Sequence, residues 1–198
     1  MELESYRKII VAIGLIGLLL FASPTIAIFV KSPSGQPFSE LYLLGPNHTF
    51  ENIPFNIVSN IENLIYIGVA NERGQSSYYT MYVKIGSQNE SLPNLDLGLP
   101  SPLPSIYEYK LFLKSEATWQ APLLFQANNL TFQSKTSFLP ILSINGIDYS
   151  VNKSSSWDSS KQGYFYNLIF ELWFYNETLG IQQYDNRFVL LRLNMTTS

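Results

Sequence analysis

The chain has 198 residues, no cysteine, one histidine and a formal net charge of -3, with 15% aromatic and 14% charged side chains. The lack of cysteine excludes a disulfide framework, a thiol nucleophile and a thiolate metal site. The small negative charge, without any basic run, argues against nucleic acid as a partner.

The N-terminal part of the chain is dominated by an apolar stretch, residues 9–30, that contains no ionisable side chain. At a helical rise of ~1.5 Å per residue, these about 22 residues reach roughly 33 Å, enough to cross a hydrocarbon core of about 30 Å. Because Arg7 and Lys8 precede it, the stretch predicts one transmembrane helix after a cytoplasmic tail of residues 1–8. A cleaved signal peptide is the alternative, since small residues follow the first apolar run.

Residues 31–37 form a Pro/Gly/Ser-rich tether to the remaining chain, residues 38–198. Even fully extended, the tether reaches only ~25 Å, so it holds the following domain near the membrane on its extracytoplasmic side. Glycosylation acceptor sequences support this location, although any one of them could arise by chance in a chain so rich in Asn and Ser. They begin at Asn47, Asn89, Asn129, Asn152, Asn176 and Asn194. Together with the lack of cysteine, they suggest an archaeal envelope glycoprotein.

From residue 38 onward the pattern is that of short strands. Residues 63–71 are apolar on both faces, which predicts a central strand, and residues 77–86 alternate as a half-buried strand does. Residues 50–58 contain Pro54 and are expected to be an edge strand or irregular, because proline cannot donate to a sheet ladder.

A different composition appears between residues 87 and 105, where four prolines alternate with leucines. The prolines predict a loop. Leucines are unusual in a freely solvated linker, so they could pack on the domain itself or face another protein or the bilayer surface. The candidate contact residues are Leu95, Leu97, Leu99 and Leu103.

The second half of the chain resumes the strand pattern. Asn145-Gly146 between two apolar runs predicts a β-hairpin, because this pair suits the positive φ angles of a type I′ turn. Residues 164–176 are expected to be the longest strand and residues 187–195 the last. Seven to nine strands without a convincing soluble helix predict an all-β, two-sheet β-sandwich.

Residues 37–72 resemble the opening of an archaeal extracytoplasmic family, domain of unknown function 1616. The resemblance is carried by Glu40, Tyr42, Leu44, Gly45, Pro46 and Asn47, by Glu51, Asn52 and Pro54, and by Gly68, Val69, Asn71 and Glu72. Trp119 and residues 170–176 extend it, so that it covers most of residues 37–196. His48 stands where a glycine is usual, and one span precedes the domain where many relatives have several. The resemblance implies an immunoglobulin-like sandwich outside the membrane, but no activity.

The sequence offers little to build catalysis on. Its one histidine, His48, lies in a predicted turn, and no spacing singles out a pair of carboxylates. No metal-ligand constellation is evident, and no cofactor is expected. Glu171 lies on an apolar strand, where a buried carboxylate needs a partner, for which Arg187 and Arg192 are the candidates.

We therefore expect a non-catalytic, membrane-anchored interaction or structural module, an accessory subunit of an archaeal membrane or envelope complex. Its expected partners are membrane lipid, through residues 9–30, and other membrane or envelope proteins. The alternative is a glycan- or peptide-binding receptor module. Trp157, in a polar loop, is the best candidate for stacking on a sugar.

Overall fold

The computed structural model describes residues 6, 7, 11 and 37–196. The predicted cytoplasmic tail, transmembrane segment and tether lie almost entirely outside these described residues. Within them, no helix has both the length and the apolar character needed to cross a membrane. The chain divides into two compact units, Met1–Pro37 and Phe38–Ser198, and the second unit carries the fold.

Eleven strands form the described part of the second unit, and no helix occurs between residues 38 and 196. They are β1 (Phe38–Leu44), β2 (Asn56–Val58), β3 (Glu62–Glu72), β4 (Ser77–Ser87), β5 (Ser105–Leu113), β6 (Thr118–Asn128), β7 (Thr131–Gln133), β8 (Thr136–Ile144), β9 (Ile147–Ser156), β10 (Tyr164–Asn176) and β11 (Ile181–Thr196).

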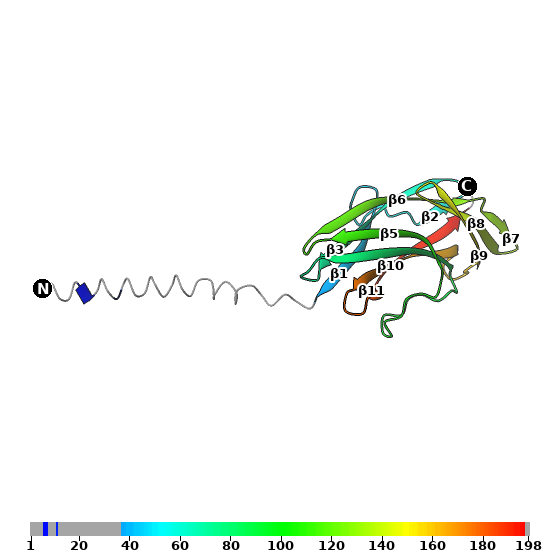
Figure 1. The fold of residues 1–198 in the computed structure, drawn as a ribbon. Coiled ribbons are helices and arrows are strands. Elements are labelled where there is room, and N and C mark those ends of the chain that lie inside the picture. Colours follow the sequence, from blue (N-terminus) through cyan, green and yellow to red (C-terminus); the bar gives the residue numbers. More distant parts are fainter. Residues whose placement is uncertain (1–5, 8–10, 12–36, 197–198) are drawn as a thin grey trace. The chain divides into compact units, whose positions relative to one another are not determined.

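The strands make two sheets (Figure 1). The first sheet has the order β1-β3-β6-β8-β7, with β9 paired to β8, and the second has the order β2-β11-β10-β4-β5. All pairings are antiparallel except that of β2 with β11. Strands β1 and β11 lie at the same side of the two sheets, where Arg187 of β11 donates from Nε to the carbonyl oxygen of Ser39 at 3.2 Å.

One hydrophobic core joins the two sheets and makes the fold a β-sandwich. Ile65 and Ile67 of the first sheet and Phe170 and Leu172 of the second belong to this core and are fully buried. Because successive strand residues point to opposite faces, the predicted alternation on β4 is confirmed, with Tyr79, Met81, Val83 and Ile85 in the core. Residues 165–172 of β10 are buried on both faces, so something also covers the outer face of the second sheet.

Several sequence-based expectations are confirmed. Strand β3 is central, lying between β1 and β6. The hairpin turn joins β8 to β9, with φ of 51° at Asn145 and 79° at Gly146. The region after Pro54 contributes only the three-residue edge strand β2.

Two expectations about strands are wrong. The fold has more than nine strands, because the three-residue strands β2 and β7 are too short to show a period. The longest strand is β11, with 16 residues against 13 in β10. It begins at Ile181 instead of residue 187, and its polar first part is interrupted by a register shift opposite Leu172 and Trp173.

Candidate functional site

The segment between β4 and β5, residues 88–104 and hereafter the leucine loop, packs on the outer face of the second sheet around Lys84 and Glu171. In Figure 1 it extends away from the two sheets after β4 and returns to β5. Its prolines have no backbone N–H to donate to a neighbouring strand, and the one β-bridge within the loop pairs Asn94 with Leu99. Its path is set by contacts with β4, β10 and β11.

A buried ion pair fixes the base of the leucine loop. Lys84 Nζ lies 2.8 Å from Glu171 Oε2, and their side chains are 7% and 0% exposed. Ser101 of the loop bonds to both partners: its N–H donates to Glu171 Oε1 at 2.7 Å, and its carbonyl accepts from Lys84 Nζ at 2.7 Å. The two charges are therefore paired and hydrogen-bonded, as buried charges require.

The prediction that Arg187 or Arg192 would pair with Glu171 is wrong. Arg187 is paired in register with Leu172, whose side chain belongs to the core, so it does not share the face of Glu171. Arg192 lies opposite Asn167, which shares the face of Glu171 but is four residues, or two repeats of the pleat, away along β10. Lys84 lies opposite Ile169 on the neighbouring strand β4, which brings its long side chain diagonally to Glu171.

The tip of the leucine loop is a tight turn that is hydrogen-bonded within itself. Asn94 and Leu99 exchange two backbone hydrogen bonds, and Asn94 Oδ1 accepts from the N–H of Leu97 at 3.0 Å. Gly98 has a φ of +62°, the left-handed conformation that favours glycine. Asn186 of β11 donates to the Leu95 carbonyl at 3.1 Å and attaches the tip to the sheet.

This rigid turn exposes leucines. Pro93 and Ser101 are buried and Leu103 is half-buried, so the base of the loop packs on the domain. Leu92, Leu95, Leu97 and Leu99 are exposed, by 40%, 52%, 69% and 53%. Of the predicted contact residues, Leu103 thus packs inward and the other three form an exposed apolar surface.

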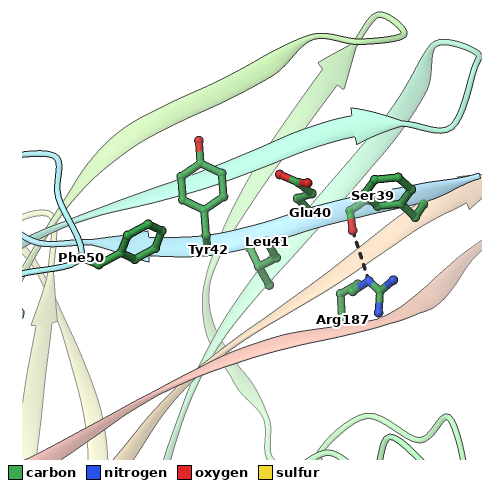
Figure 2. Close-up of a pocket in the computed structure, with 7 residues that line it drawn as sticks. Ser39, Glu40, Leu41, Tyr42, Phe50 and Arg187 are labelled. Atoms are coloured by element: carbon green, nitrogen blue, oxygen red, sulfur yellow. Dashed lines mark hydrogen bonds between the residues drawn. The ribbon is translucent and has the colours of Figure 1, made fainter.

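A groove of about 640 Å³ lies beside the loop along edge strand β1 (Figure 2). It is lined by Phe38, Ser39, Glu40, Leu41, Tyr42, Phe50 and Arg187. Figure 2 shows Glu40 and Tyr42 on one side of β1 and Leu41 and Arg187 on the other. The groove and the loop meet at β11, where Asn186 contacts Leu95 and its neighbour Arg187 contacts Ser39.

Two groups near this junction have raised pKa values. Burial, with the charges of Glu171 and Asp185 as smaller causes, raises the pKa of Tyr184 to about 12. Burial also raises the pKa of Asp185, opposed by Ser39, Arg73 and Arg187. Asp185 pairs with Arg73 at 2.9 Å, so its role is that of a structural ion pair in the first half of β11.

The residues that carry the family resemblance have structural roles. A Cβ on Gly68 would lie 2.0 Å from the Tyr42 ring, and one on Gly45 would lie 2.0 Å from the Glu51 carbonyl oxygen. Asn71 is fully buried and donates to the carbonyls of Gln75, Leu113 and Lys114 while accepting from Tyr79. His48 has a φ of 57°, the conformation for which glycine is the usual residue.

His48 is exposed, stacks on Tyr66 with 3.8 Å between ring centroids, and accepts from the Gln120 amide at 2.7 Å. Within the part of the chain that the structure describes, no three His, Cys, Asp or Glu side chains gather to hold a metal ion.

The six glycosylation candidates differ in their surroundings. Asn47, Asn89, Asn129 and Asn152 are exposed. The amide of Asn176 donates to Gln183, and its oxygen accepts from two N–H groups of the following turn. Asn194 is half-buried between Asn56, to which it donates, and Tyr164, whose N–H it accepts. Four acceptor sites are therefore open, and two are engaged in the fold.

Trp157 is 40% exposed and does not stand alone. Its ring packs edge-on against Tyr164 at 5.0 Å between centroids, and Tyr164 contacts Phe132 at 5.2 Å. Its backbone N–H donates to Lys135. Trp157 is thus the partly exposed member of a small aromatic cluster that also contains Phe132 of β7 and Tyr164 of β10.

No family model matches the chain, and no curated protein matches it. Among solved structures it is similar to the CARDB domain of a Pyrococcus furiosus protein in complex with di-metal ions, with 9% identity, a TM-score of 0.39 and coverage of 82% of this chain and 90% of that one. It is also similar to a beta-glucosidase from Listeria innocua in complex with gluconolactone, with 5% identity, a TM-score of 0.40 and coverage of 80% of this chain and 16% of that one. Neither likeness assigns an activity to this chain.

Proposed function

We propose that this protein is a non-catalytic, membrane-anchored contact module, an accessory subunit of an archaeal membrane or cell-envelope complex. In this proposal residues 9–30 anchor the chain, residues 31–37 keep the domain near the membrane, and an immunoglobulin-like, glycosylated sandwich faces outward. The leucine loop is the surface that meets another membrane or envelope protein.

The observation that carries the proposal is the leucine loop itself. A flexible loop would lose conformational entropy when it binds a partner, whereas a preorganised one loses little. Here the buried Lys84–Glu171 pair, Ser101 and Asn186 already hold the loop in place. The leucines it exposes are costly in water and gain free energy when a partner covers them.

The test is affinity purification of the full chain from native membranes in mild detergent, followed by quantitative mass spectrometry. The variant carries Leu95→Ser, Leu97→Ser and Leu99→Ser, all at exposed positions. Ile147→Ser, at a position 53% exposed on the β8–β9 hairpin, is the matched control. Stoichiometric companions that are retained by the control and lost from the triple variant support the proposal. Recovery of the wild-type chain without any such companion contradicts it.

A glycan-binding module is the second candidate, and the exposed rim of the Trp157 cluster favours it. Aromatic rings beside polar loops can stack on sugars. Trp157→Ala should then weaken binding to isolated envelope glycans at least tenfold, whereas Phe50→Ala, also at an exposed aromatic position, should not. Equal binding by both variants would remove this candidate.

A further inference from the structure

We infer that the leucine loop of one copy of this chain seats in the β1 groove of a second copy, and that the exchange is reciprocal. The inference deepens the proposed function, on which it rests, because it names one occupant for the exposed leucines. The groove is the seven-residue concavity along edge strand β1 described above.

The two surfaces are chemically complementary. The groove combines the apolar and aromatic side chains of Phe38, Leu41 and Phe50 with the Arg187 guanidinium. Within residues 37–196, the charge of Arg187 acts on the nearby Asp185 carboxylate, but Arg187 forms no ion pair. Its one hydrogen bond uses Nε and leaves the two terminal nitrogens. The loop combines exposed leucines with a single carboxylate at its tip, Asp96, which is also exposed. Apolar groups thus meet apolar groups, and Asp96 meets Arg187.

The one acidic residue of the groove, Glu40, lies apart from Arg187. Figure 2 shows Glu40 projecting from the side of β1 opposite to Leu41 and Arg187.

The placement of the two surfaces suits a two-fold dimer. In a two-fold interface the same pair of patches contacts twice, so both patches must lie close together on each copy. Here both surfaces contact the same part of β11, since Asn186 donates to Leu95 of the loop and Arg187 donates to Ser39 of the groove. A shared membrane would also raise the effective concentration of one copy for another, so a modest interface could suffice.

Because the chain contains no cysteine, introduced cysteines report the contact cleanly. Two full-length chains with different affinity tags, one with Leu97→Cys and the other with Phe50→Cys, are reconstituted together in nanodiscs and treated with a short bis-maleimide. We expect a cross-linked pair carrying both tags, at least tenfold above the yield for Ile147→Cys with Phe50→Cys. All three positions are exposed, so the substitutions leave the core intact.

Charge reversal identifies the ion pair. Asp96→Arg should reduce the cross-link severalfold, and adding Arg187→Asp in both chains should restore it. A Leu97–Phe50 yield no higher than that of the Ile147 control overturns the inference, whatever the charge variants do. That result leaves the proposed function standing if other chains still co-purify through the leucines. Conversely, a strong cross-link without any other co-purifying chain supports self-association and contradicts the accessory-subunit role.

Discussion

The buried Lys84–Glu171 pair is the residue-level feature on which the leucine loop depends. Removing two charges from water is expensive, and here the cost is offset by their mutual attraction and by two hydrogen bonds to Ser101. The pair therefore attaches the leucine loop to the face of the sheet. Removing one partner should cost more stability than replacing both, because it leaves the other charged and buried.

Glu171→Gln should lower the free energy of unfolding by about 3–5 kcal/mol, since Lys84 would lose its counter-charge in a buried site. Lys84→Met combined with Glu171→Gln should recover part of that loss. Urea denaturation of the purified protein measures both. The control is Glu108→Gln, which breaks the exposed Lys110–Glu108 pair and should leave stability almost unchanged, because solvent screens exposed charges. Equal losses for Glu171→Gln and Glu108→Gln would show that the buried pair does not hold the fold.

Tyr184 gives a second prediction at this scale, on pH dependence. Its hydroxyl is buried without a hydrogen-bond partner among the described residues, and its pKa is raised from 10.0 to about 12. Between these values the unfolded chain ionises this phenol while the folded chain keeps it protonated, so stability falls as pH rises from about 10 to about 12. Tyr184→Phe should lessen that fall and leave stability at pH 7 unchanged or slightly higher. Identical losses in the variant and the wild type between these pH values would contradict the assignment.

At the scale of elements, the turn after β1 brings backbone very close to a glycine: among the glycines that the structure describes, Gly45 has the closest backbone neighbour. The N–H of Gly45 donates to the Thr49 carbonyl at 2.7 Å, and the Glu51 carbonyl lies where a Cβ would be. This turn directs the chain from β1 toward β2, and it forms one end of the region that carries Phe50 into the groove.

Gly45→Ala should therefore destabilise the domain by about 1–3 kcal/mol, because a backbone atom must move to admit the methyl group. Ser159→Ala, at an exposed loop position, should change stability by less than about 0.5 kcal/mol. Thermal or urea unfolding of the two variants compares them directly. The account of this turn is wrong if both variants unfold at the same midpoint as the wild type.

The elements that the sequence predicts well are those whose signal is local. Strands β3 and β4 show apolar periodicity, and the Asn145-Gly146 turn has its own conformational preference. The short strands β2 and β7 have no period to detect. The first part of β11 is polar and contains a register shift, so it lacks the apolar alternation that predicts a strand. The sequence therefore predicts only the apolar second half of β11.

The candidate site was harder to predict because it depends on which strands are neighbours. The composition of the Pro- and Leu-rich segment predicts a loop with candidate contact residues. The path of that loop depends on the ion pair that Lys84 and Glu171 form between β4 and β10. Neither composition nor periodicity indicates the β1 groove. Its residues are separated by more than a hundred positions from Arg187, and only the closing of the sandwich brings them together.

At the scale of the whole molecule, the two sheets share one hydrophobic core and carry an unusual loop. The leucine loop packs on the outer face of the second sheet around Lys84 and Glu171 and leaves its own leucines in water. We propose that another chain covers these exposed leucines in the native membrane. This coverage is the central claim, whether the covering chain is a second copy or a different subunit.

The most direct test is the rate of maleimide labelling of single cysteines in intact native membranes. The account predicts that a Leu97→Cys chain is labelled at least about tenfold more slowly than an Ile147→Cys chain, although residue 97 is the more exposed of the two in the isolated domain, at 69% against 53%. Dispersal in strong detergent should bring the two rates together. Equally fast labelling of both cysteines in native membranes would contradict the claim, because it would show the leucine loop standing uncovered where the protein works.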